Sequence, residues 1–441
     1  QDQVTGVFEI QGKVAERVAE ALKLQLTEGQ QKTLTSRPTN NLEAYDYYLR
    51  GKALEAGTRN PTEFSRAITQ YQRAIALDSG FAKAYASLAR AQLNVYWFLS
   101  GASPRRLELA KAAIDRALTL DPRLPAAQLA LSDYYYHGKL DYPRALAAIE
   151  SAQRLAPNDP QGMDIKGRIE RRQNRWNEAV SDMRRASELD PRNTTFLDDL
   201  CETQRWARNY DDAQKTCGTL IAIEPENWLG YRGLVRAVVL RSGDVKAALA
   251  VLVEAQKQIG AETLVAGWTG QELIWPTVLN PDLARSMAPV VEPTEGAQRT
   301  EYFARKLELA VYQRNAPATR QFADSIILYG PRSLHGNFFD SDIHSDLALA
   351  YAAKGDRAKT LEEGKQAMSI LPLQSDALRG ADNMLLIARA AVLVGANDEA
   401  LAAFRQLLSM SSDVSQASLR VDPWFEPLRR DPRFKQLVSG P

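Results

Sequence analysis

The chain of 441 residues contains few of the residues from which catalytic and metal sites are most often built. It has three histidines, His137, His335 and His344, and two cysteines. The histidines lack the His-Glu-x-x-His spacing of a helical zinc site, and no Cys-x-x-Cys pair occurs. No glycine-rich phosphate loop follows a recognisable strand. We therefore expect no metal, no cofactor and no catalytic residue, so that the chain is not an enzyme.

An excess of one charge and a long apolar run are also missing. The 55 lysines and arginines balance the 54 aspartates and glutamates, which leaves a net charge of +1. Because no global field attracts polyanions, we expect no nucleic-acid partner. No stretch approaches 18 consecutive apolar residues, so none is predicted to span a bilayer. The first residue is Gln1 and no signal sequence follows it, so we expect a segment of a longer protein.

What the chain does contain is a 34-residue period. Ala179, Ala213 and Ala247 recur at this interval, as do Pro191 and Pro225. This is the period of the tetratricopeptide repeat, a pair of antiparallel helices that buries its apolar face only by stacking on its neighbours. The prediction is an all-α tetratricopeptide-repeat superhelical solenoid.

Nine units fit the pattern, some with insertions. We place an amphipathic helix and linker at 1–41, a first array at 42–260, an irregular junction at 261–299, a second array at 300–412 and a capping tail at 413–441. The junction combines tryptophan with proline and indicates either a bend between two halves or a degenerate repeat. We favour the bend, because tryptophans in a proline-rich segment typically anchor a packed junction.

The two ends resemble a known group of proteins. Residues 8–22 (FEIQGKVAERVAEAL), 37–51 (RPTNNLEAYDYYLRG) and 419–434 (LRVDPWFEPLRRDPRF) are similar to stretches of multidomain bacterial signalling proteins. In that group a TolB-like domain ends in such a helix and a tetratricopeptide array follows. The resemblance implies a C-terminal sensor or docking region, with a kinase, an adenylate cyclase or a winged-helix regulator upstream. A membrane tether upstream is also implied, which leaves a cytoplasmic and a periplasmic location open.

The two cysteines fall in one repeat, 16 residues apart. Cys201 takes a small-residue position of the first helix and Cys217 a large-residue position of the second, and these positions face each other. A disulfide is geometrically plausible and would add roughly 3 kcal/mol by the chain-entropy model. The alternative is a pair of buried thiols that act as small apolar residues.

Arginines recur on the face of the first helices that lines the inner groove of such solenoids. The candidate partner-binding residues are Arg90, Tyr136, Arg168, Arg171, Arg172, Arg205, Trp206, Arg232 and Arg236. Guanidinium groups suit carboxylates, so this groove predicts a protein or peptide partner with an acidic or C-terminal segment. In the alternative interpretation, the arginines pair with Asp164, Asp198 and Glu202 and only solubilise the face.

The function that these observations favour is a regulatory and protein-interaction module of a bacterial signalling protein. A second hypothesis is a small-ligand or stress-sensing domain that controls an N-terminal effector domain.

Overall fold

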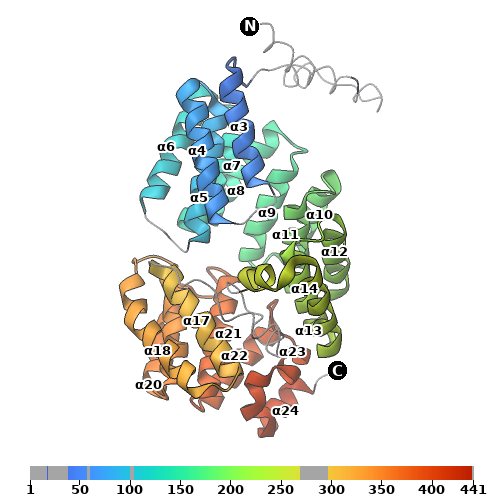
Figure 1. Ribbon diagram of the computed structural model, residues 1–441, viewed down its shortest axis with the longest axis vertical. Helices are drawn as coiled ribbons and strands as arrows, with labels where there is room; N and C mark the ends of the chain where they lie inside the picture. The colour runs from blue at the N-terminus through green and yellow to red at the C-terminus, as the bar shows by residue number, and fades with distance from the viewer. Residues whose placement is uncertain (1–16, 18–37, 57–59, 100–103, 269–295, 440–441) are drawn as a thin grey trace. The chain divides into compact units, whose positions relative to one another are not determined.

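The computed structural model describes residue 17 and residues 38–56, 60–99, 104–268 and 296–439. Regular structure in these residues is helical, which confirms the predicted all-α fold (Figure 1). Nine helix pairs occur in this described part, as the repeat pattern predicts. Their bounds are α3 (Leu42–Glu55), α4 (Pro61–Leu77), α5 (Ala82–Phe98), α6 (Arg105–Leu120), α7 (Pro125–Lys139), α8 (Tyr142–Leu155), α9 (Pro160–Arg172), α10 (Trp176–Leu189), α11 (Thr194–Trp206), α12 (Tyr210–Ile223), α13 (Trp228–Ser242), α14 (Val245–Trp268), α17 (Gly296–Tyr312), α18 (Ala316–Tyr329), α19 (Asp340–Ala353), α20 (Arg357–Ile370), α21 (Arg379–Leu393) and α22 (Asn397–Ser409).

The chain divides into two compact units between Pro157 and Asn158. The first contains α3 to α8, and the second contains α9 onwards. This boundary falls inside the array predicted at 42–260, whose six helix pairs are therefore shared between the units. The predicted element at 1–41 and the predicted junction at 261–299 lie largely outside the described residues. At the edge of that junction, α14 is interrupted at Gly260, which has a φ of 75°.

Helix starts recur with the same period as the alanines. Asp159, Asn193 and Asn227 are 34 residues apart, and each side-chain oxygen accepts a hydrogen bond from the backbone N–H two residues later, at 3.0 to 3.2 Å. An oxygen in this position satisfies one of the orphan donors of a helix N-terminus. Because the caps repeat, α9, α11 and α13 begin in the same register and present equivalent positions on the same face.

The structure joins Cys201 of α11 to Cys217 of α12 in a disulfide. Their Cα atoms are 5.6 Å apart, within the usual range for such bonds. The next repeat leaves room for the bridge with a glycine, because a Cβ on Gly233 of α13 would collide with the Cys217 sulfur. The disulfide therefore links α11 to α12 and packs directly against Gly233 of α13.

The C-terminal tail packs on the last helix pair within the second unit. Its elements are α23 (Gln416–Val421), the 3-10 helix η2 (Pro423–Arg430) and α24 (Pro432–Val438). Asp422 and Asp431 cap η2 and α24, each followed by proline, as the Asp-Pro pattern indicates. The Phe425 ring contacts the Phe404 ring of α22 edge-on, with centroids 4.9 Å apart. The tail also reaches α13, which lies beside α23 (Figure 1).

Among the helices of the described residues, none has the length and apolar character needed to cross a membrane.

Candidate functional site

The predicted arginines of the second unit lie on three successive first helices. We call them the arginine face: Arg168, Arg171 and Arg172 on α9, Arg205 on α11, and Arg232 and Arg236 on α13. The 34-residue register places Arg171 and Arg205 at equivalent positions of neighbouring helices. All of these arginines except Arg168 are buried, and Arg205 is only 1% exposed. Buried cations need anionic partners, so the identity of those partners decides what the face can do.

Part of the arginine face is neutralised within its own repeats. Arg171 donates to the Thr203 hydroxyl at 3.1 Å and to carboxylate oxygens of Glu202 at 3.3 Å and Asp199 at 3.4 Å. These bonds tie α9 to α11 and give Arg171 a structural role in the stack.

Two further arginines also face carboxylates of the array. Arg168 pairs with Asp164 at 3.0 Å, one turn away on α9, and Arg232 lies 3.9 Å from Asp198. These are partners named in the alternative interpretation of the groove, so this part of the face resembles a network of local ion pairs.

The other arginines bind aspartates from distant parts of the sequence. Asp413, in the segment between α22 and α23, forms ion pairs with both Arg205 and Arg236. The neighbouring Arg208 anchors the same segment by donating to the backbone carbonyls of Leu407 at 3.0 Å and Val414 at 3.4 Å. One carboxylate therefore bridges two helices of the array, as an acidic peptide is predicted to do.

Arg172 makes the second distant contact. Its guanidinium donates to Asp376 at 2.9 Å, and its backbone carbonyl accepts from the Ala377 N–H at 2.8 Å. Asp376 also accepts from the Leu378 and Arg379 amides at the start of α21. The repeat pattern did not single out Asp376 or Asp413, because both lie between helices, where the period imposes no residue type.

Trp206, predicted to line the groove as a partner-binding residue, is buried. Its ring is 2% exposed and lies parallel to the Trp176 ring, with centroids 5.8 Å apart. Both tryptophans belong to a core cluster that includes residues of α17, α19, α21 and the tail. Trp206 therefore belongs to a core that the first and the later helix pairs of the second unit share.

Arg90 and Tyr136 lie in the first unit and belong to a different cluster. The Arg90 Nε donates to Asp133 at 2.8 Å, which links α5 to α7. Tyr136 is buried, and its ring centroid is 4.5 Å from that of His137 and 5.6 Å from that of Trp97. Within the second unit, the structure brings together the predicted residues of α9, α11 and α13.

A cavity of about 40 Å³ adjoins Asp413 in the second unit. Arg236, Arg389, Ser418 and Asp422 contribute its polar lining. Burial raises the pKa of the Asp422 carboxyl, although the nearby Arg389 opposes the shift. The cavity has room for a few water molecules and is far smaller than a typical ligand pocket. Recognition at the arginine face would therefore rest on side-chain contacts with a carboxylate.

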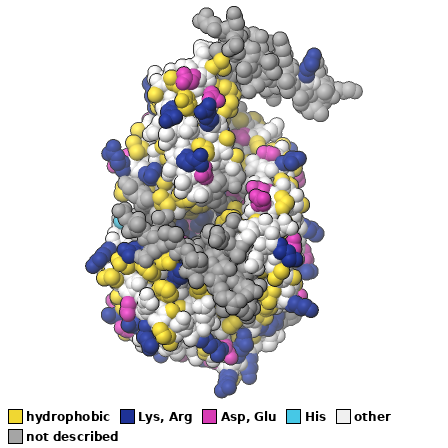
Figure 2. Space-filling model, viewed as in Figure 1, with side chains coloured by type: hydrophobic (Ala, Val, Ile, Leu, Met, Phe, Trp, Pro, Cys, Tyr) yellow, Lys and Arg dark blue, Asp and Glu magenta, His cyan; other side chains and the backbone are white. Residues whose placement is uncertain are grey.

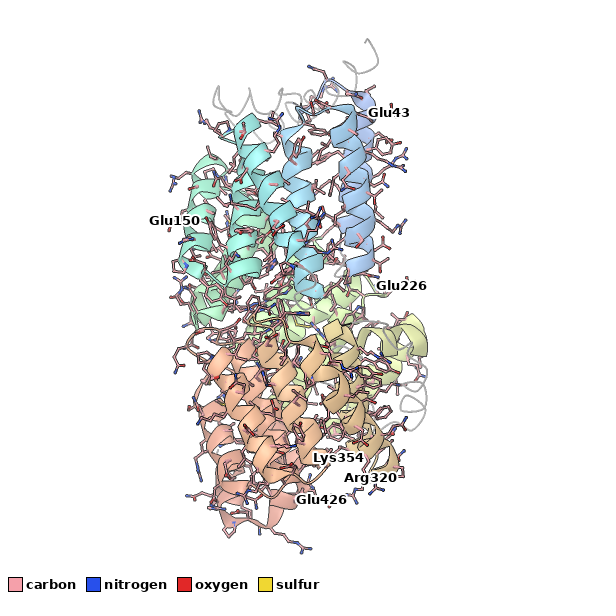
Figure 3. All side chains as sticks on the ribbon, turned by 90° about the vertical axis from the view of Figure 1, so that its left-hand side faces the viewer. Glu43, Glu150, Glu226, Arg320, Lys354 and Glu426 are labelled. Atoms are coloured by element: carbon pink, nitrogen blue, oxygen red, sulfur yellow. A yellow bond between two sulfur atoms is a disulfide. The ribbon has the colours of Figure 1, made fainter. Side chains whose placement is uncertain are left out.

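The outer surface has a different character. Lysine and arginine side chains are interspersed with aspartate and glutamate over the described part of the view in Figure 2. Lys354 and Glu426, labelled in Figure 3, belong to solvent-exposed ion pairs with Asp324 and Arg314. In the described residues, no group of three or more His, Cys, Asp or Glu side chains is arranged to hold a metal ion.

No family model matches the chain, and no curated protein matches it. Solved repeat proteins do resemble it. The alignment with a thermophilic TPR protein of Thermus thermophilus spans 45% of this chain and 100% of that protein, with 18% sequence identity and a TM-score of 0.38. The helix pairs of the chain, with α9, α11 and α13 starting 34 residues apart, form a tetratricopeptide-type array.

Two other solved structures give similar values. One is YrrB, described as a TPR protein with an unusual peptide-binding site. The alignment spans 44% of this chain and 92% of YrrB, with 22% sequence identity and a TM-score of 0.27. The other is the human IFIT1 dimer with m7Gppp-AAAA. The alignment spans 82% of this chain and 76% of the IFIT1 chain, with 12% sequence identity and a TM-score of 0.44. These likenesses concern the repeat architecture alone.

Proposed function

We propose that this array is a protein-binding scaffold, the regulatory part of a bacterial signalling protein, whose arginine face takes an acidic or C-terminal peptide of its partner. Arrays of this type use their inner surfaces for binding. The observation that supports the proposal is the double ion pair of Asp413 with Arg205 and Arg236. It is an intramolecular example of the contact that a partner's carboxylate would make.

The chemistry of the two arginines suits this role. Guanidinium groups recognise carboxylates through fixed donor geometry, and buried ion pairs are strongly destabilised when one partner is removed. Arg205 and Arg236 therefore need a carboxylate at all times. A partner would bind by exchanging its own carboxylate for that of Asp413, so the net affinity is the difference between two similar contacts. The signalling context rests on the resemblance of the chain's ends to multidomain bacterial proteins.

The test is a binding comparison that removes the internal competitor. The probe is a fluorescent pentapeptide with three glutamates and a free C-terminus, followed by anisotropy against the wild-type chain and the Asp413→Asn variant. We expect the variant to bind at least tenfold more tightly, with affinity that falls as salt is raised. An otherwise identical glutamine peptide with an amidated C-terminus is the matched control and should not bind.

Specificity is checked with a second substitution. Adding Arg236→Gln to the Asp413→Asn variant should abolish the gain, while circular dichroism verifies that both variants stay helical. Equal affinity of wild type and folded Asp413→Asn for the acidic peptide would overturn the proposal.

A further inference from the structure

The segment that supplies Asp413 contacts the array through more than its carboxylate. The two carboxylate oxygens are divided between helices: Oδ1 of Asp413 pairs with Arg205 of α11, and Oδ2 pairs with Arg236 of α13. The next residue, Val414, is 2% exposed and belongs to the core cluster of the second unit. The array therefore holds two adjacent side chains of this segment, one acidic and one aliphatic.

Val414 occupies an apolar position beside the ion pairs. Apolar side chains of α13 and α21 line the same cavity as Val414, namely Val239, Leu240 and Leu385. Removing an aliphatic side chain from water in such surroundings is favourable. Because the cavity adjoins Val414, the larger side chains of leucine and isoleucine also have space at this position.

Arg208 holds the backbone of the same segment. Its Nη2 donates to the carbonyl of Val414 at 3.4 Å and to that of Leu407, in the last turn of α22, at 3.0 Å. A peptide presents the first of these carbonyls only if a residue follows its acidic residue. The contact therefore depends on the backbone that follows the carboxylate and complements the ion pairs, which depend on the carboxylate alone.

The backbone of Arg208 is unusual for its residue type. Arg208 lies in the turn between α11 and α12 with a φ of 64°, a left-handed conformation that bulky residues rarely adopt. The same turn occurs in other helix pairs, where the N–H of the left-handed residue donates to the carbonyl three residues earlier at 2.9 to 3.2 Å; the residues there are Asn174, Gly355 and Gly395. Asparagine and glycine adopt this conformation more readily than arginine. An arginine at this turn indicates a role for its guanidinium.

We propose that the arginine face selects peptides in which an acidic residue is followed directly by an aliphatic one, and that Arg208 positions the backbone of this pair. The inference rests on the proposed function and specifies the peptide that this function would recognise. Arg205 and Arg236 take the carboxylate, the position of Val414 takes the aliphatic side chain, and Arg208 takes the carbonyl that follows. Asp413 and Val414 are the copy of this motif that the chain itself places at the site.

The experiment uses the full chain with Asp413→Asn, which removes the competing carboxylate, and measures the anisotropy of fluorescent, C-terminally amidated peptides. The reference peptide is Gly-Ser-Asp-Val-Gly-Gly. In a second peptide serine replaces the valine, and a third, Gly-Gly-Gly-Gly-Ser-Asp, ends at the aspartate. We expect the reference to bind about tenfold more tightly than the serine peptide, because only the valine buries an aliphatic side chain. It should also bind more tightly than the truncated peptide. Equal affinity for the reference and serine peptides would overturn the inference.

Arg208→Asn, added to the Asp413→Asn chain, tests the backbone contact. Asparagine suits the left-handed turn, as Asn174 shows, so the variant should stay folded, which circular dichroism verifies. We expect affinity for the reference peptide to fall about fivefold and the preference over the truncated peptide to disappear. Arg314→Asn is the matched control, because Arg314 has a φ of 54° in the turn between α17 and α18 but pairs with the exposed Glu426. An unchanged preference in folded Arg208→Asn would refute the role of Arg208.

The outcomes separate this inference from the proposed function. If acidic peptides bind the Asp413→Asn chain with no regard to the residue that follows the aspartate, the array is still a binding scaffold and the selection for an aliphatic residue is wrong. If none of the acidic peptides binds, the proposed function fails, and the inference fails with it.

Discussion

The arginine face differs from three carboxylates of the later helix pairs, Glu301 of α17 and Asp342 and Asp346 of α19, in how closely its charges are paired. Each lies on the first helices of consecutive pairs in the second unit. The arginines of α9, α11 and α13 are supplied with carboxylates, two of them from segments about 200 residues away in sequence. The carboxylates of α17 and α19 lie farther from their arginines, at 4.0 Å for Glu301 and Arg305 and at 3.6 Å for Asp342 and Arg379.

The difference shows how one repeat architecture separates stability from binding. A buried charge that is paired fixes the packing of the elements that carry it. A buried charge without close partners costs stability and leaves a site that a ligand can complete. In this array the first arrangement holds the tail and the segment around Asp376 in place.

The largest expected effect comes from removing the carboxylate that the arginine face holds. Asp413→Ala leaves Arg205 and Arg236 buried without that partner, which should lower the free energy of unfolding by about 3–5 kcal/mol. The measurement is the urea midpoint of the second unit's unfolding transition, by circular dichroism. Asp398→Ala removes an exposed carboxylate that pairs with Arg433, and should change stability by less than about 1 kcal/mol. A loss of similar size in both variants would mean that Asp413 is not a structural ligand.

The disulfide supports the arginine face and has no counterpart beside the carboxylates of α17 and α19 in the described residues. Cys201→Ser with Cys217→Ser should destabilise the second unit by about 2–4 kcal/mol, by the usual effect of a bridge that closes a short loop. Thermal unfolding with and without a reductant tests this in the wild-type chain, and the double variant should be insensitive to the reductant. Unchanged melting of the wild-type chain on verified reduction would show that α11 does not depend on the bridge.

The periodic part of this structure was predictable from sequence. The recurring alanines and prolines predicted the nine helix pairs. The placement of Cys201 and Cys217 on facing helices made a disulfide plausible beside the alternative of two buried thiols, and the structure contains the disulfide. Both follow from local rules: small residues where helices approach, and proline where a helix has ended.

The occupants of the site were not predictable in the same way. Asp376 and Asp413 lie in connecting segments, where no period restricts the residue type. Their contacts with Arg172, Arg205 and Arg236 depend on how the second unit closes on itself. The burial of Trp206, a predicted groove residue, was not foreseen for the same reason, because the residues that share its core cluster belong largely to α17 and later elements.

Glu170 offers a further test of this comparison, because it is a buried carboxyl without close cations on α9, a helix of the arginine face. It is 2% exposed on α9, and its nearest cations are Lys166 at 3.5 Å and Arg175 at 3.7 Å. Burial raises its pKa from 4.5 to about 7; Lys166 opposes the shift and Asp182 adds to it. A carboxyl whose pKa is higher in the folded state binds its proton more tightly there.

The stability that Glu170 contributes is therefore present at low pH and lost as the pH rises through about 7. Relative to Glu170→Gln, the wild-type chain should lose at most about 3 kcal/mol between pH 4.5 and pH 8. Urea unfolding of both proteins across this range measures the difference directly, and Glu178→Gln, a carboxylate in the first turn of α10, serves as control. A constant difference between wild type and Glu170→Gln would contradict the raised pKa. If the wild-type chain instead gained stability with rising pH relative to Glu170→Gln, Lys166 and Arg175 would compensate the burial of the Glu170 carboxylate. Glu170 would then be paired as fully as Arg205 and Arg236 are paired with Asp413.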